Sequence, residues 1–133
     1  MEKQNTNAGL ELLSLLKQQR YLYHQLKMLT DRHRQAAGTT SPELLLEVIY
    51  GRRKLVEKLR QLNHKLRPIR AGWDKLSPQI EPEHKAQASS VATQVKKIVA
   101  DIVATVPSDL AQNLPLNGDC IFDELLADHQ PQQ

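Results

Sequence analysis

Apolar residues in the first third of the chain recur in alternating steps of three and four. One register, with members seven residues apart, contains Leu15, Leu22, Leu29 and Ala36. A companion register contains Leu12, Gln19, Leu26 and His33. Such spacing keeps side chains on one face of a helix, so it predicts a helix from Leu10 to about Ala37, about 42 Å long. Because Leu13, Leu16 and Tyr23 widen the apolar stripe, we expect this helix to contact more than one neighbour.

A short turn then leads into a second predicted helix. Gly38 suits the position just past a helix end, Ser41 is a good N-cap, and Pro42 suits the first helical position. Two registers follow, with Leu45, Leu59 and Leu66 in one, which Arg52 interrupts, and Val48, Leu55 and Leu62 in the other. We expect this helix to end near Arg67, because Pro68 breaks or kinks the chain. The short turn implies an antiparallel hairpin of the two helices.

A third helix is predicted beyond a linker that contains two prolines, at residues 77–82. One further helical turn, with Trp73 and Leu76, precedes the linker. The apolar face of the third helix, Glu83 to about Val106, is rich in β-branched residues: Val91, Val95, Ile98, Val99, Ile102, Val103 and Val106. A strand at residues 98–106 is the alternative, but the length and the spacing favour a helix. The predicted fold class is all-α, a long antiparallel helical hairpin with a third packed helix and a C-terminal tail.

The remaining residues are expected to be an acidic, largely disordered tail at 108–133, because Pro115 and the pair Asn117-Gly118 disfavour regular structure. The tail contains one amphipathic segment, in which Asp119 could cap a short helix that presents Ile121, Phe122, Leu125 and Leu126 on one side. So short a helix is unstable alone in water and needs a surface. The predicted organisation is thus a flexible N-terminus at 1–9, a helical domain at 10–107 and this tail.

Charge is distributed unevenly along the chain, which has a net charge of +3. Residues 1–107 hold all 18 basic and 10 acidic residues, whereas residues 108–133 hold five acidic and no basic residues. The single cysteine, Cys120, excludes an intrachain disulfide and is consistent with a reducing compartment. No apolar stretch approaches the roughly 18 residues of a membrane span. We therefore expect a cytoplasmic protein without membrane insertion.

The sequence contains no pattern typical of catalysis. The five histidines include no pair at the helical i, i+4 spacing of a metal site, and the five glycines are scattered rather than gathered in a phosphate loop. Acidic neighbours would raise the pKa of Cys120 and leave it a poor nucleophile. We predict no enzymatic activity, no cofactor and no metal.

Two surface features could carry a binding function. The first is basic, with eight cations and one acidic residue between Arg52 and Arg70. It could bind nucleic acid, but the charges occupy many angles around the helix, without a helix-turn-helix or interleaved aromatics, so a solvated face is favoured. The second is apolar, because a third helix can cover only part of two long leucine-rich faces. A groove between helices accepts an amphipathic helix from a partner, and self-association through a coiled coil is the structural alternative.

The first two helices resemble the FlgN-like flagellar export chaperones over about residues 10–76. The first part of the resemblance lies in Leu12, Leu13, Leu16, Gln19, Tyr23, Leu26 and Leu29, followed by a turn that contains Gly. The second part lies in Leu44, Leu45, Arg52, Arg53, Leu55, Leu59, Leu62, Leu66, Arg70 and Trp73. The short Val-rich third segment and the acidic tail with its proline depart from the family.

The resemblance implies a small cytoplasmic chaperone of the flagellar type III secretion system. Such proteins bind the terminal helices of secreted hook-filament junction proteins, the hook-associated proteins, and also engage a component of the export gate. The residues predicted to contact the client are those of the third helix, namely Val95, Ile98, Val99, Ile102 and Val106. We also predict that the segment with Ile121, Phe122, Leu125 and Leu126 folds over the same groove when no client is present.

Overall fold

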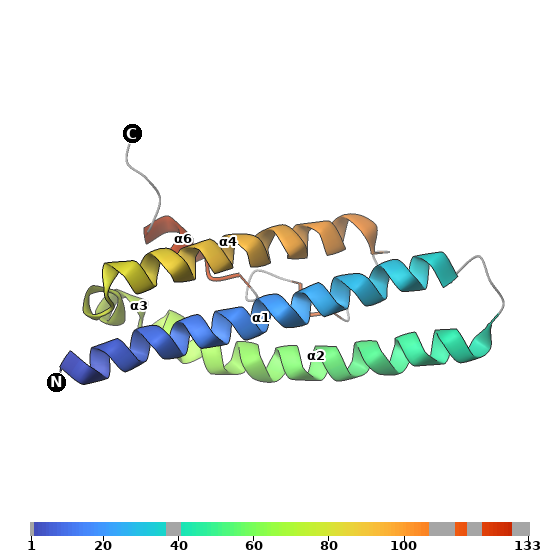
Figure 1. The fold of residues 1–133 in the computed structure, drawn as a ribbon, viewed down its shortest axis with the longest axis horizontal. Coiled ribbons are helices and arrows are strands. Elements are labelled where there is room, and N and C mark those ends of the chain that lie inside the picture. Colours follow the sequence, from blue (N-terminus) through green and yellow to red (C-terminus); the bar gives the residue numbers. More distant parts are fainter. Residues whose placement is uncertain (1, 37–40, 107–113, 117–120, 129–133) are drawn as a thin grey trace.

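The computed structural model describes residues 2–36, 41–106, 114–116 and 121–128, and all regular structure within these residues is helical. Helix α1 (Glu2–Ala36) and helix α2 (Pro42–Ala71) form an antiparallel hairpin, and helix α4 (Pro82–Thr105) packs along α1 (Figure 1). The predicted all-α class, a long hairpin with a third packed helix, is confirmed.

Helix α1 has 35 residues and begins eight residues before the predicted start at Leu10. Residues 2–9 of the N-terminus predicted to be flexible therefore belong to α1. The polar residues there carry no apolar spacing, and extending an existing helix costs far less than nucleating one, so periodicity alone misses them. As the widened stripe predicted, α1 contacts two neighbours, α2 and α4.

Helix α2 begins as predicted and ends later than predicted. The Ser41 side chain accepts a hydrogen bond from the Leu44 amide at 3.3 Å, and Pro42 is the first helical residue. The expectation that the helix ends before Pro68 is wrong, because α2 continues through Pro68 to Ala71. Pro68 is exposed and lies within the last turn, while buried Leu66 and Trp73 on either side hold the backbone on the core. This packing outweighs the lost hydrogen bond.

The chain reverses direction between α2 and α4. The predicted extra turn is helix α3 (Trp73–Leu76), and a 3-10 turn, η1 (Ser77–Gln79), follows it. Residues 98–105 are helical within α4, so the strand alternative is wrong. Its buried side chains return at helical spacing: Ala88, Ser89, Val91, Ala92, Val95, Val99 and Ile102.

The polar interruptions of the two heptad patterns meet across the hairpin. Arg52 Nη2 of α2 lies 2.8 Å from His33 Nδ1 of α1. A guanidinium can only donate, so the imidazole nitrogen is the acceptor. Burial lowers the pKa of Arg52 from its ordinary value. The polar residue that interrupts each apolar stripe therefore finds its partner in the other helix, and the two form a hydrogen bond between α1 and α2.

Candidate functional site

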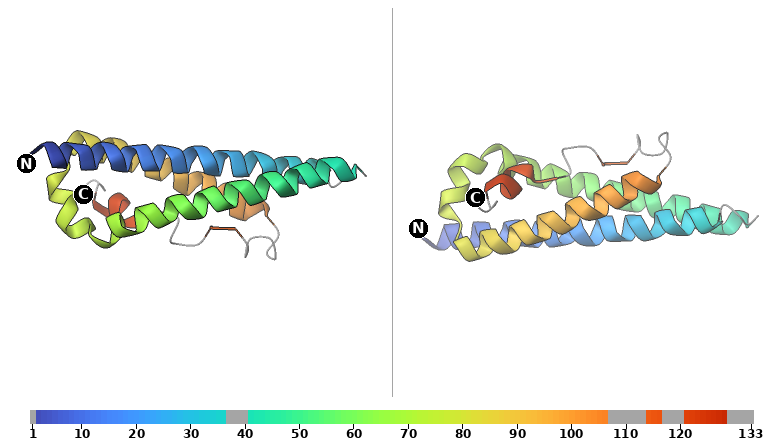
Figure 2. Two further views of the ribbon diagram at one scale, coloured as in Figure 1. Left: turned by 90° about the horizontal axis from the view of Figure 1, so that it is seen from below. Right: turned by 90° about the horizontal axis from the view of Figure 1, so that it is seen from above.

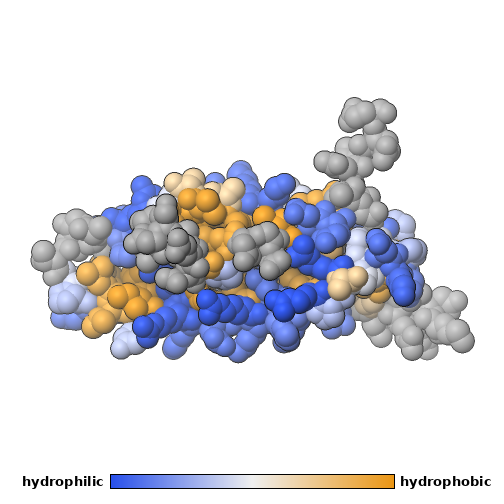
Figure 3. All heavy atoms as spheres, turned by 180° about the vertical axis from the view of Figure 1, so that it is seen from behind, coloured by the Kyte–Doolittle hydropathy of each residue, from blue (hydrophilic) through white to orange (hydrophobic). Residues whose placement is uncertain are grey.

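Helices α2 and α4 both pack against α1 but make little direct contact with each other in the described part of the chain. The three helices therefore form a trough, with α1 as its floor and α2 and α4 as its walls. The side chains that line it belong to the buried core: Leu12, Leu16, Tyr23 and Leu26 of α1, Leu59, Leu62 and Leu66 of α2, and Val91, Val95, Val99 and Ile102 of α4. Figure 3 views this side of the molecule and shows apolar residues between hydrophilic margins.

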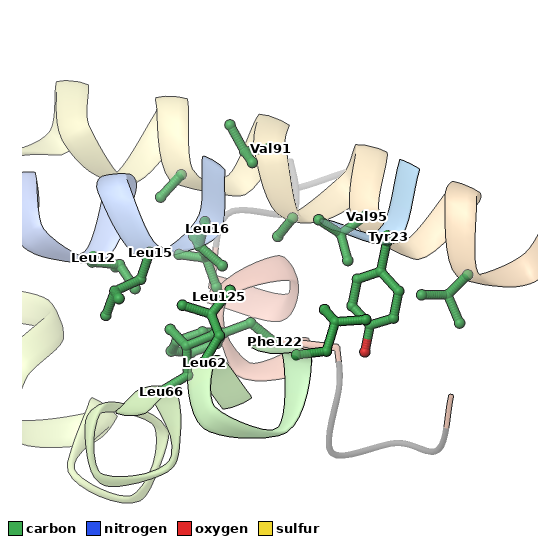
Figure 4. Packing of buried hydrophobic residues seen from close by; sticks show 14 of the residues in the cluster. Leu12, Leu15, Leu16, Tyr23, Leu62, Leu66, Val91, Val95, Phe122 and Leu125 are labelled. Carbon is green, nitrogen blue, oxygen red and sulfur yellow. The ribbon is translucent and has the colours of Figure 1, made fainter. Parts of the chain in front are cut away.

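The C-terminal segment lies in this trough. It comprises residues 114–116 and 121–128, including the short helix α6 (Asp123–Asp128). Figure 2 shows α6 at the end of the molecule where α2 ends and α4 begins. Helix α6 contacts α4, and Figure 4 shows Leu125 between Leu16 of α1 and Leu62 and Leu66 of α2. The predicted amphipathic segment thus has the surface that a short helix needs.

Two residues of this segment are fully enclosed. Phe122 is 2% exposed and Leu125 is 0% exposed. The Phe122 ring meets the Trp73 ring edge-on, with centroids 5.2 Å apart at 71°. The Arg70 guanidinium lies 5.8 Å from the centroid of the same ring, and its Nε donates a hydrogen bond of 3.1 Å to Glu124 Oε1. The segment is therefore held by apolar burial in its centre and by one ion pair at its edge.

A chain of hydrogen bonds crosses the floor of the trough. Gln19 Nε2 donates to Asn63 Oδ1 at 2.9 Å, and Asn63 Nδ2 donates to the Tyr23 hydroxyl at 3.4 Å. The Tyr23 hydroxyl in turn donates to the backbone carbonyl of Pro115. Tyr23 is fully buried and Gln19 nearly so, so the floor offers a positioned hydroxyl donor to a backbone carbonyl within an apolar surface.

Trp73 provides a second buried donor at the end of the trough. Its indole Nε1 has no hydrogen-bond partner among the described residues, although the residue is only 4% exposed. A buried donor without an acceptor costs free energy, and a carbonyl or carboxylate brought to this position would recover it. The trough therefore suits an apolar, partly acidic segment. Hydrogen-bond acceptors of that segment would be fixed by the Tyr23 hydroxyl and the Trp73 indole N–H, which donate.

The structure brings together the two sets of residues predicted to contact a client. Val95, Val99 and Ile102 are buried, and Ile98 and Val106 are partly buried against the same cluster. Phe122 and Leu125 are buried in that cluster, and Ile121 and Leu126 pack against it. All nine are covered, wholly or in part, by other segments of the chain, so the third helix is not an open face here. Contact with a client remains a prediction that requires the C-terminal segment to move.

Several other predictions fall outside this arrangement. Helix α6 begins at Asp123, so Phe122 rather than Asp119 precedes it, and Asp119 and Cys120 lie outside the described residues. Of the basic cluster, Arg70 contacts the C-terminal segment, through Glu124 and the Phe122 ring. Sequence reasoning missed Asn63 and the roles of Tyr23 and Trp73. One signal was present, because Gln19 is a polar residue between Leu12 and Leu26 in the same register.

Within the described residues, no group of His, Cys, Asp or Glu is arranged to hold a metal ion. The helices described here also include none that combines the length and apolar character needed to cross a bilayer. In comparisons with protein-family models, curated proteins and solved structures, the chain matches none of them. The similarity to FlgN-like chaperones therefore stays a prediction from the residues quoted above.

Proposed function

We propose that this protein is a chaperone that holds an amphipathic helix of a partner protein in the trough and shields its apolar face. One observation supports this more than any other. The trough already holds an amphipathic segment, because Phe122 and Leu125 are buried in it while Asp123 and Glu124 remain exposed. A surface that accepts one such helix from its own chain has the chemistry to accept another from a client.

The resemblance of residues 10–76 to the FlgN-like chaperones supports a client class. On this proposal the client is the terminal helix of a secreted flagellar hook-filament junction protein, bound in the cytoplasm before export. An export-gate component is then a second expected partner. The client-contacting residues are those of α4 and the trough floor that the C-terminal segment now covers.

Helix lengths favour exchange of the C-terminal segment for a longer client. Helix α6 has six residues and is about 9 Å long, whereas α4 has 24 residues and is about 36 Å long. Six residues gain too little helix stability to form alone, so the ordering cost offsets much of the apolar burial. A client helix that spans the whole trough buries more surface. To bind, it must displace the tethered C-terminal segment, whose effective concentration is of millimolar order.

Removal of the competitor tests the proposal directly. A variant that lacks residues 118–133 is expected to bind the terminal helix of a hook-filament junction protein about tenfold or more tightly than the full chain. Titration by fluorescence anisotropy with a labelled client peptide measures both affinities. Unchanged or weaker affinity would contradict competition for the trough.

Trp73, the only tryptophan of the chain, reports on the same event. Leu125→Asp places a charge in the buried position and is expected to expel α6, which exposes Trp73 and shifts its emission to longer wavelength. Val103→Asp is the matched control, because Val103 is 50% exposed on α4 and its change should leave the emission where it was. Equal shifts in the two variants, with native helix content by circular dichroism, would mean that α6 does not cover Trp73.

A further inference from the structure

The outer side of the hairpin carries a second groove, away from the trough. Tyr21 and Tyr23 are two positions apart on α1 and so project to nearly opposite sides of it. Tyr23 is buried in the trough, whereas Tyr21 is 63% exposed and lines a groove of about 700 Å³ between α1 and α2. Its apolar lining includes Leu10, Leu13 and Leu22 of α1, together with Leu62 of α2, which also lines the trough. The groove runs along two helices and is open to solvent.

The charges that line this groove are all positive. Lys17 of α1 and Lys58 and Lys65 of α2 line it, and no Asp or Glu is among its described lining residues. None of the three lysines forms an ion pair within the part of the chain that the structure describes. A neighbouring hollow between α1 and α4 shares Lys17 and Tyr21 and adds Arg20 and Lys97, again without an acidic residue. An apolar floor between cationic edges matches an apolar stripe between anionic ones.

We propose that this lysine-edged groove is a second docking site, which takes an amphipathic helix with acidic flanks from a partner protein. A second copy of this chain fits less well, since a symmetric pair would set the same lysines against one another. Glu124 of α6 lies on the other side, where it pairs with Arg70. Because the groove and the trough lie on different sides of α1, both can be occupied at once.

Two synthetic peptides of one design test the assignment. Both carry leucines at i, i+3, i+4 and i+7, and they are flanked by glutamates in one peptide and by lysines in the other. With the full chain, anisotropy is expected to detect binding of the glutamate peptide, weakened by added salt, and no binding of the lysine peptide. The triple variant Lys17→Glu, Lys58→Glu, Lys65→Glu should bind the glutamate peptide about tenfold or more weakly.

The matched control reverses three exposed lysines that line neither hollow: Lys54→Glu, Lys75→Glu and Lys96→Glu. Its net charge equals that of the first variant, so it should stay within about twofold of the full chain. Tyr21→Ser should weaken binding without loss of helix content. Four results would overturn the proposal: equal loss in both triple variants, a peptide-induced shift of Trp73 emission, a dimer that buries Tyr21, or tighter binding of a short DNA duplex than of the peptide.

Discussion

Helix α1 presents apolar side chains on two sides, which differ in how far the rest of the chain covers them. On the trough side, Leu16 and Tyr23 are fully buried beneath the C-terminal segment. On the outer side, Leu10 and Tyr21 are at least half exposed, in a groove of comparable chemistry between α1 and α2. Both are clefts between α1 and one or two neighbouring helices.

The difference lies in the edges of the two clefts. The trough floor has neutral polar groups that satisfy one another, so an apolar segment can cover it without burying an unpaired charge. The outer groove has Lys17, Lys58 and Lys65 at its edges, and a neutral cover would strip water from these cations without compensation. A segment of the same chain closes the first cleft, and an acidic partner is required to close the second.

The largest expected difference between the two sides concerns core stability. Leu16→Ala should lower the free energy of unfolding by about 3–5 kcal/mol, because the side chain is fully enclosed and leaves a cavity. Leu10→Ala on the outer side should cost about 0.5 kcal/mol or less. Urea unfolding followed by circular dichroism measures both. Similar losses would mean that the outer groove is covered in solution.

A smaller contrast is expected for the two tyrosines. Tyr23→Phe removes the hydroxyl that donates to Pro115 and accepts from Asn63, and should cost about 1–2 kcal/mol of unfolding free energy. Tyr21→Phe should change it by less than about 0.5 kcal/mol. Urea unfolding measures both changes. An unchanged free energy of unfolding in Tyr23→Phe would show that the hydrogen-bond chain does not stabilise the closed trough.

The smallest effect is expected at the edge ion pair. Arg70→Ala removes the bond to Glu124 and the contact with the Phe122 ring, so local opening of α6 should become easier by about 1 kcal/mol. Amide exchange of residues 123–126 should then accelerate about fivefold. Lys27→Ala, which removes a comparable pair with Asp101 between α1 and α4, is the control and should leave these amides unchanged.

The sequence was sufficient for the three long helices and their pairing. Heptad spacing located α1 and α2, and the Ser41-Pro42 signal placed the start of α2 at the correct residue. The length and the spacing of the β-branched apolar face located α4. The sequence was insufficient where a local signal for a helix end competes with tertiary packing. Pro68 signals a helix end, yet the enclosed residues around it carry α2 on to Ala71.

The site was only partly predictable. The amphipathic pattern identified Phe122 and Leu125 as residues in need of a surface, and the β-branched face of α4 identified one wall of that surface. The chain of Gln19, Asn63 and Tyr23 joins residues about 40 positions apart, and no local pattern records which polar groups will meet. The lysine-edged groove was hidden for the same reason, because its cations come from two helices whose relative rotation is set by packing.

The position of the C-terminal segment along the chain has a consequence for biosynthesis. Phe122 and Leu125 come after the floor and both walls of the trough in sequence. A ribosome that adds about 5–20 residues per second completes α4 roughly 1–4 s before it reaches these residues. Each newly made molecule therefore acquires the segment that closes the trough only after every helix that forms the trough has been synthesised.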